Sequence, residues 1–232
     1  MPTRIHLLAS HAVPPSVLTG PAVRQWLSEE EIQAALRGRN DQVRHRKLAN
    51  KILVRALLGQ HLNRPPAAIT ISRSDSGKPY LPEHPDLHFN LSHSGDWVAI
   101  AISEEGPVGV DIEHPRRRRS WRAIARQYFH PAEVSLLQTL ETPEAEREFY
   151  RLWTLKEAFF KGRGTGIAEG LGRIDFSSGL RPNAQPGFDL ERWRFCHWSL
   201  TDEPGGPLFL SCSLPKGLQR AALVRDLPPI LG

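Results

Sequence analysis

The chain has 232 residues, of which 40% are hydrophobic and 24% are charged, a composition that is ordinary for a globular protein and sufficient for one large or two small cores. No apolar run approaches the roughly 18 residues of a membrane helix, and the apolar stretch near the N-terminus is too short and interrupted for a signal peptide, so we expect a cytoplasmic protein without a membrane partner. The formal net charge of +5 suits a polyanionic ligand, an acidic partner or nucleic acid and does not choose among them.

Two helices are predicted in the first quarter of the chain. Ser28–Glu31 has the pattern of a capping box that opens a helix. A second helix is expected from about Asp41 to Gln60, because its apolar residues recur at helical spacing on one face. Arg46 lies at the head of this apolar face, where it either serves a binding site or reaches back to solvent.

Strands are predicted in the middle of the chain, after Asn63–Pro66 interrupts the second helix. Strand-like runs separated by turn signals cover Ala68–Ser72, Leu87–Leu91, Trp97–Ile102 and Val108–Glu113.

The second half repeats the order of helices followed by strands. Helices are predicted at Trp121–Phe129, Pro131–Leu140 and Pro143 to about Lys161, and strands at Trp193–Leu200, Leu208–Leu214 and Arg220–Val224. No helix follows each strand, which excludes a doubly wound parallel sheet. We therefore expect an α+β protein with two halves, residues 1–105 and 106–232.

The strand at Val108–Glu113 carries the first candidate site. Residues alternate faces along a strand, so Asp111 and Glu113 share one face. Two neighbouring carboxylates repel each other unless a hard cation binds between them. The alternative is a polar strand face in solvent.

The segment Trp153–Gly162 carries the second candidate site. Glu157 and Lys161 are four residues apart and share a helix face. They could form a surface ion pair that stabilises by about 0.3–0.5 kcal/mol. Trp153 and Thr154 fall on the same face, however, which predicts that Glu157 borders buried surface, where a carboxylate requires a cation or a proton.

A third candidate site is the segment Phe89–Trp97, where His93 lies between Ser92 and Ser94 at a strand end. This arrangement suits a phosphate clamp, and Lys78 adds a cation just upstream. The alternative for His93 is an ordinary turn histidine.

Four motifs occur in a fixed order along the chain: GKP at 77–79, FNLSHS at 89–94, GVDIE at 109–113 and WTLKEAFFKG at 153–162. In this order they resemble the motif series of the 4′-phosphopantetheinyl transferases. The length is similar to that of the surfactin-synthetase-activating type, which has two halves and is monomeric, whereas the trimeric type is about half as long. The resemblance implies a pseudo-twofold pair of α+β halves with the active site at their interface.

The resemblance also implies the reaction. Members of this family transfer 4′-phosphopantetheine from coenzyme A to a serine of an apo acyl or peptidyl carrier protein and release adenosine 3′,5′-bisphosphate. By analogy, Asp111, Glu113 and Glu157 would bind Mg²⁺, or Mn²⁺ in its place. Glu157 also matches the proposed base, although a metal ligand is a poor base, and Lys161 matches a catalytic lysine near the pyrophosphate.

The remaining matches concern coenzyme A. The positions that correspond to its binding residues are Arg46, Lys78, Ser92, His93, Lys156 and Lys161. Lys156 lies about 100° around the helix from Glu157 and could serve structure instead. Near Glu31 and Ala34 relatives often carry lysines for the 3′-phosphate, and this chain departs from them.

Other functions also fit parts of the sequence. Arg116–Arg119 is either a solvated loop or a docking site for an acidic carrier protein. A metal-dependent nuclease or phosphohydrolase could use the same three acidic residues. A nucleic-acid-binding module lacks any recognised motif, so we expect no nucleic-acid partner. The two cysteines, Cys196 and Cys212, form no Cys-x-x-Cys pair and are expected to be buried thiols.

Overall fold

The computed structural model describes residues 3–116, 120–166, 170–217 and 221–226. The first part of the chain forms β1 (Arg4–Ala9), α1 (Pro15–Leu18), α2 (Glu29–Leu36), α3 (Asp41–Leu62), β2 (Ser72–Arg73), β3 (Pro79–Tyr80), β4 (His88–Ser94) and β5 (Trp97–Ser103). The second part forms β6 (Gly109–Glu113), α4 (Trp121–Tyr128), α5 (Pro131–Thr139), α6 (Thr142–Arg163), β7 (Ile174–Asp175), β8 (Asn183–Ala184), β9 (Trp193–Leu200), β10 (Leu208–Pro215) and β11 (Ala222–Val224).

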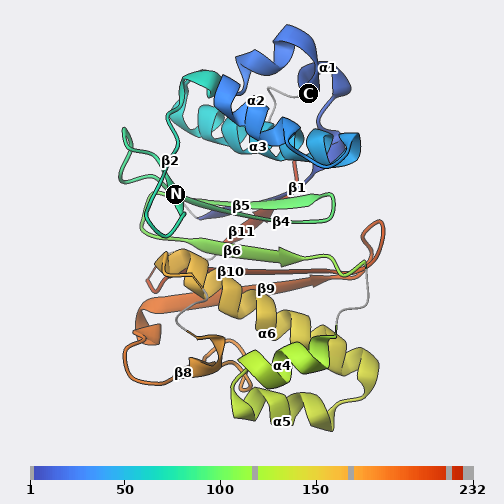
Figure 1. Ribbon diagram of the computed structural model, residues 1–232. Helices are drawn as coiled ribbons and strands as arrows, with labels where there is room; N and C mark the ends of the chain where they lie inside the picture. The colour runs from blue at the N-terminus through green and yellow to red at the C-terminus, as the bar shows by residue number, and fades with distance from the viewer. Residues whose placement is uncertain (1–2, 117–119, 167–169, 218–220, 227–232) are drawn as a thin grey trace.

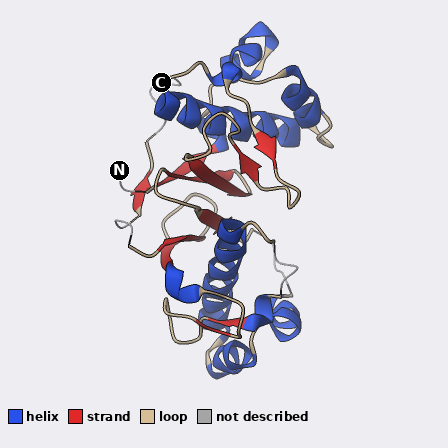
Figure 2. Ribbon diagram, turned by 90° about the vertical axis from the view of Figure 1, so that its left-hand side faces the viewer, coloured by secondary structure: helices blue, strands red, loops and turns tan. Residues whose placement is uncertain are grey.

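Two sheets lie at the centre of the molecule, with helices outside them (Figures 1 and 2). The first sheet has the strand order β11-β1-β5-β4, and the second has the order β6-β10-β9. All neighbours in these sheets are antiparallel except β1 and β11, which run parallel. The structure is therefore an α+β fold, as the sequence predicts.

The side chains of β5 show how the layers pack. Val98, Ile100 and Ile102 point into a core shared with α3, because alternate residues of a strand face opposite sides. Trp97, Ala99 and Ala101 point the other way, into a core shared with apolar residues of β6 and β10. A third core lies under α6 and contains most of the phenylalanines of the second half.

Capping residues set the ends of the long helices. The side chain of Asn40 accepts a hydrogen bond from the Val43 amide at the start of α3, and Asn63 ends that helix in a left-handed conformation (φ 50°). The predicted capping box of Ser28 and Glu31 opens α2. Gly164 ends α6 with φ 78°, which a glycine adopts without strain.

The prediction of a strand at Ala68–Ser72 is wrong. Residues 66–68 form a 3₁₀ turn, and the next strand, β2, does not begin until Ser72. The carbonyl groups of Pro66 and Ile69 accept hydrogen bonds from Arg55, at 2.6 and 2.8 Å. A buried arginine thus satisfies backbone groups that a neighbouring strand would otherwise satisfy.

β1 is a strand that the sequence did not predict, and the last strand pairs with it in the first sheet and not with the strands of the second half. β1 runs through the centre of the first sheet, with Arg4 opposite Ile102 on one side and Ala222 on the other. The strand predicted at Arg220–Val224 exists as β11, although Arg220 itself lies outside the described residues. It joins the sheet formed by the first part of the chain.

Two further observations bear on the predictions. None of the described helices is both long and apolar enough to cross a membrane. Cys196 and Cys212 lie opposite each other on β9 and β10; Cys212 is buried as predicted, whereas Cys196 is partly exposed.

Candidate active site

The two sheets meet along β4 and β6, and side chains of β4 hold the two strands together. The Val110 amide donates a hydrogen bond to Asn90 Oδ1 at 3.0 Å. Ser92 Oγ donates to Asp111 Oδ1 at 2.8 Å, and Ser94 Oγ donates to Glu113 at 3.2 Å. The predicted carboxylate strand and the predicted phosphate-clamp strand are therefore neighbours.

α6 approaches β6 very closely at Gly109. A Cβ atom at this position would lie 1.9 Å from the carbonyl oxygen of Ala158 and 2.4 Å from the amide nitrogen of Gly162. Such distances exclude any side chain, so only glycine permits the contact. The contact places Glu157 and Lys161, one on each side of Ala158 along α6, beside the carboxylate face of β6.

Lys161 connects the helix to both strands. Its Nζ lies 2.6 Å from Asp111 Oδ1 and donates to Ser92 Oγ at 3.0 Å. These groups line a pocket of about 350 Å³ whose wall also contains His93, Glu113, Glu157 and Trp153. The structure thus gathers residues that are up to 69 positions apart in the sequence.

The other carboxylates of this pocket act on Glu157. Burial raises the pKa of Glu157 to about 7, the negative charges of Asp111 and Glu113 add to this effect, and Lys161 opposes it. A carboxyl group with such a pKa binds a proton near neutral pH unless a cation takes its place. The alternative of a surface ion pair between Glu157 and Lys161 does not describe this environment.

The oxygen atoms of the pocket suit a hard cation. Asp111 Oδ2 is buried and has no hydrogen-bond partner in the described part of the chain. Residues 3–116, 120–166, 170–217 and 221–226 contain no preformed cluster of three His, Cys, Asp or Glu side chains at metal-binding spacing. Mg²⁺ does not require such a cage, because it usually takes one or two protein carboxylates and completes its shell with water and substrate phosphates. The donor set of Asp111, Glu113 and Glu157 therefore fits Mg²⁺.

His93 and Arg46 lie on the β4 side of the pocket. Burial lowers the pKa of His93; a backbone hydrogen bond and Asp111 oppose this shift, whereas Lys161 and Arg46 add to it. Arg46 Nη1 donates to the carbonyl oxygen of Gly95 at 3.0 Å and contacts Asp96 Oδ1 at 3.3 Å. The arginine at the head of α3 is thus held at the β4–β5 turn and does not extend freely into solvent.

Lys78 lies in an adjoining pocket of about 240 Å³, which shares Leu91 and Lys161 with the first. Its Nζ donates to the carbonyl oxygen of Gly162 at 2.6 Å. Burial lowers the pKa of Lys78 to about 8. The adjoining pocket also contains Arg73, so a second phosphate-sized anion would meet cations there.

Lys156 does not join this group. Its ammonium group is fully buried, 2.8 Å from Glu133, and donates to the carbonyl oxygens of Leu171 and Ile174. The structure therefore does not bring it to the pocket as a binding residue for coenzyme A. The alternative reading, that it serves structure, agrees with this placement.

Several contacts were not foreseen from the sequence. Asp96 pairs with Arg46 and also with Arg116, at 2.9 Å, and its place in the Ser94–Asp96 turn was the available signal. Glu31 is bound by Arg55 at 2.7 Å. Residues 117–119 of the arginine run lie outside the described residues.

Most of the chain is similar in sequence to known proteins. Residues 107–212 match the profile of the 4′-phosphopantetheinyl transferase superfamily, and residues 17–105 match the profile of the 4′-phosphopantetheinyl transferase N-terminal region. A 4′-phosphopantetheinyl transferase of Bacillus subtilis is 36% identical over 146 residues, which cover 63% of each chain. The 4′-phosphopantetheinyl transferase Sfp of Bacillus subtilis strain 168 is 33% identical over 165 residues, or 71% of each chain. The match therefore spans less than two thirds of the first relative and more than two thirds of the second.

Proposed function

The chain belongs to the 4′-phosphopantetheinyl transferase superfamily, a family of enzymes, and we propose that it transfers the 4′-phosphopantetheine group of coenzyme A to a serine of an apo acyl or peptidyl carrier protein. The observation that carries this proposal is the pocket between β4, β6 and α6, where three carboxylates and Lys161 converge. Adenosine 3′,5′-bisphosphate is then the second product, and Mg²⁺ is required.

The cations around the pocket support the binding of coenzyme A. Lys161 would contact the pyrophosphate, because it lines the pocket and its Nζ lies 2.6 Å from Asp111 Oδ1. His93 lines the same pocket, Arg46 lies close enough for its charge to act on His93, and both would bind the 3′-phosphate. Lys78, in the adjoining pocket, would contact a further phosphate oxygen. Charge-assisted hydrogen bonds to phosphate are about twice as strong as neutral ones.

Asp111, Glu113 and Glu157 would hold the metal ion. When bound, Mg²⁺ supplies positive charge that offsets the pyrophosphate of coenzyme A. The protein itself orients the reactants for an in-line displacement. The serine oxygen forms a bond to the phosphorus that carries pantetheine, and the anhydride bond on the opposite side breaks. Lys161 offsets the charge that develops on the departing phosphate.

The serine proton needs an acceptor, and Glu157 has a suitable pKa of about 7 in the metal-free protein. Coordination to Mg²⁺ would lower that pKa and weaken the base. The two roles can be separated with Glu157→Gln. A ligand role predicts that the variant needs a higher Mg²⁺ concentration for half-maximal rate. A base role predicts a low rate that does not depend on pH near 7, with unchanged Mg²⁺ dependence.

The transfer itself is tested with apo carrier proteins. Incubation with coenzyme A and Mg²⁺ should add one phosphopantetheine to the carrier, as measured by mass spectrometry. Asp111→Asn and Glu157→Gln should lower kcat/KM by about 10²-fold or more, since each removes charge that the transition state requires. Glu191→Gln, at an exposed position outside the pocket, is the matched control and should remain active. No mass gain with acyl and peptidyl carriers alike would refute the proposed function.

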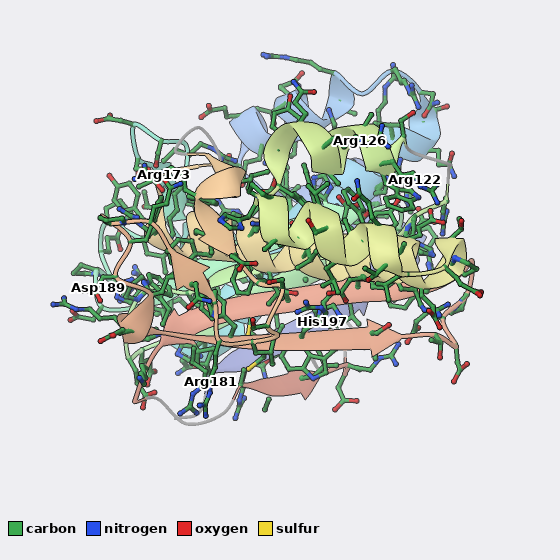
Figure 3. The ribbon with its side chains drawn as sticks, turned by 90° about the horizontal axis from the view of Figure 1, so that it is seen from below. Arg122, Arg126, Arg173, Arg181, Asp189 and His197 are labelled. Carbon is green, nitrogen blue, oxygen red and sulfur yellow. The ribbon has the colours of Figure 1, made fainter. Side chains whose placement is uncertain are left out.

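The exposed face of α4 supports docking of an acidic carrier protein. Arg122 and Arg126 lie together on this helix (Figure 3) and line a groove with Trp121 and Leu137 between α4 and α5. Charge complementarity accelerates encounter and is screened by salt. We therefore expect raised salt to increase KM for the carrier more than KM for coenzyme A. Equal salt sensitivity of the two constants would argue against this docking face.

A further inference from the structure

A second polar pocket lies far from the candidate active site, at the opposite end of α3. It has a volume of about 260 Å³, and its lining residues belong to α3, β1, β5 and the residue that follows β5. Arg46 lies in the second turn of α3, near the candidate active site, whereas His61 lies 15 residues later, about 22 Å along the helix axis. The proposed transfer reaction uses no residue of this second pocket.

Arg4 provides a free positive charge at the second pocket. Its side chain is exposed and forms no hydrogen bond or ion pair with any described residue. Glu104 is the only carboxylate among the pocket's described lining residues, and His61 Nε2 holds its Oε1 at 2.8 Å. The guanidinium of Arg4 is therefore the charged group of the pocket that is left to bind a ligand.

His6 provides a buried polar group in the same pocket. It is 8% exposed, and its Nδ1 atom is buried without a hydrogen-bond partner in the described part of the chain. Burial, followed by the positive charges of Arg4 and His61, lowers the pKa of His6 to about 4. The imidazole is thus neutral at pH 7. A buried polar atom without a partner is unfavourable and invites a ligand or a water molecule.

We propose that this pocket binds a small oxyanion, a carboxylate or a phosphate, whose charge Arg4 neutralises and whose oxygen accepts a hydrogen bond from His6. The planar guanidinium of arginine matches the paired oxygens of both groups. Leu57 and Ile102 form an apolar wall that accommodates a short alkyl chain beside the anion.

The test is a titration of protein whose histidines are labelled for NMR spectroscopy. Binding is monitored through the ring signals of these histidines. Inorganic phosphate and butyrate are added separately as probes, so that the two arms distinguish the two anion classes. We expect the His6 and His61 signals to shift saturably with at least one probe. Arg4→Gln should weaken that binding by about tenfold or more, since it removes the charged donor.

The controls separate this pocket from the candidate active site. Arg181→Gln removes another exposed arginine, on the second half of the molecule (Figure 3), and should bind the probe as the unchanged protein does. The His93 signal reports anion binding at the candidate active site in the same spectra, so the result does not depend on the transferase proposal. Equal affinity in Arg4→Gln and the unchanged protein, or no saturable His6 shift with either probe, would overturn the inference.

Discussion

Lys156 and Lys161 show how strongly position decides the role of a residue. Both belong to α6 and to the same sequence motif, yet Lys156 is fully buried against Glu133 and Lys161 lines the pocket. Helical spacing predicts that Lys161 shares a face of α6 with Glu157 and that Lys156 does not. Strand alternation predicts that Asp111 and Glu113 share a face of β6. The structure agrees with both predictions. The contact of Lys161 with Asp111 joins two elements, and no local pattern could have revealed it.

Replacing Lys156 should mainly lower stability, whereas replacing Lys161 should mainly lower activity. Lys156→Ala leaves Glu133 as a buried charge without its partner, which should lower the free energy of unfolding by about 3–5 kcal/mol. The fraction that remains folded should keep its KM for coenzyme A. Lys161→Ala should instead lower kcat/KM by about tenfold or more with a smaller change in stability.

Denaturant unfolding and steady-state kinetics on both variants provide the measurement. A raised KM for coenzyme A in Lys156→Ala, with stability unchanged, would return this lysine to the binding site.

Individual elements with strong local signals could be predicted, and those defined by distant partners could not. The helix at Asp41–Leu62 has regular apolar spacing, and the helix at Thr142–Arg163 has a proline in its first turn, so their positions were foreseen. β1 contains Ile5, Leu7 and Leu8, with both faces buried, and such a short apolar run has no diagnostic period. The strand predicted at 68–72 is not formed as predicted, because the Arg55 side chain, from the preceding helix α3, donates to the carbonyl group of Ile69.

The contact between β6 and α6 leads to a prediction about Gly109. Gly109→Ala would place a methyl group against backbone atoms of α6, which cannot move aside as a side chain can. We expect a loss of stability at or above the upper end of the roughly 1–3 kcal/mol typical of overpacking. Transfer activity should fall as well, because α6 carries Glu157 and Lys161.

Gly20→Ala is the matched control for Gly109→Ala. Gly20 has φ 62° and open space around its Cβ position, so alanine there adds only backbone strain of about 1 kcal/mol. Thermal unfolding of the two variants measures the difference. Equal melting temperatures would show that β6 and α6 are not packed as closely as described.

At the scale of the whole molecule, residues from both sides of the predicted division near residue 105 share one core. Ile5, Leu7 and Trp97 from the first sheet pack against apolar residues of β6 and β10. β11, near the C-terminal end, pairs with β1 in the first sheet. The order of helices and strands predicted two halves, but it contains no information about which sheet the last strand joins, because that choice depends on a long-range pairing.

This shared core predicts that the halves do not fold separately. A piece with residues 1–105 would expose Ile5, Leu7 and Trp97 and lose β11, and each large apolar side chain contributes roughly 1.5–3 kcal/mol when buried. That loss is comparable with the whole stability of a typical protein, about 5–15 kcal/mol. Circular dichroism and NMR should therefore show each piece, 1–105 or 106–232, unfolded or aggregated alone, with native spectra restored when both are co-expressed. Dispersed native-like spectra from either piece alone would mean that the division near residue 105 separates two independent domains.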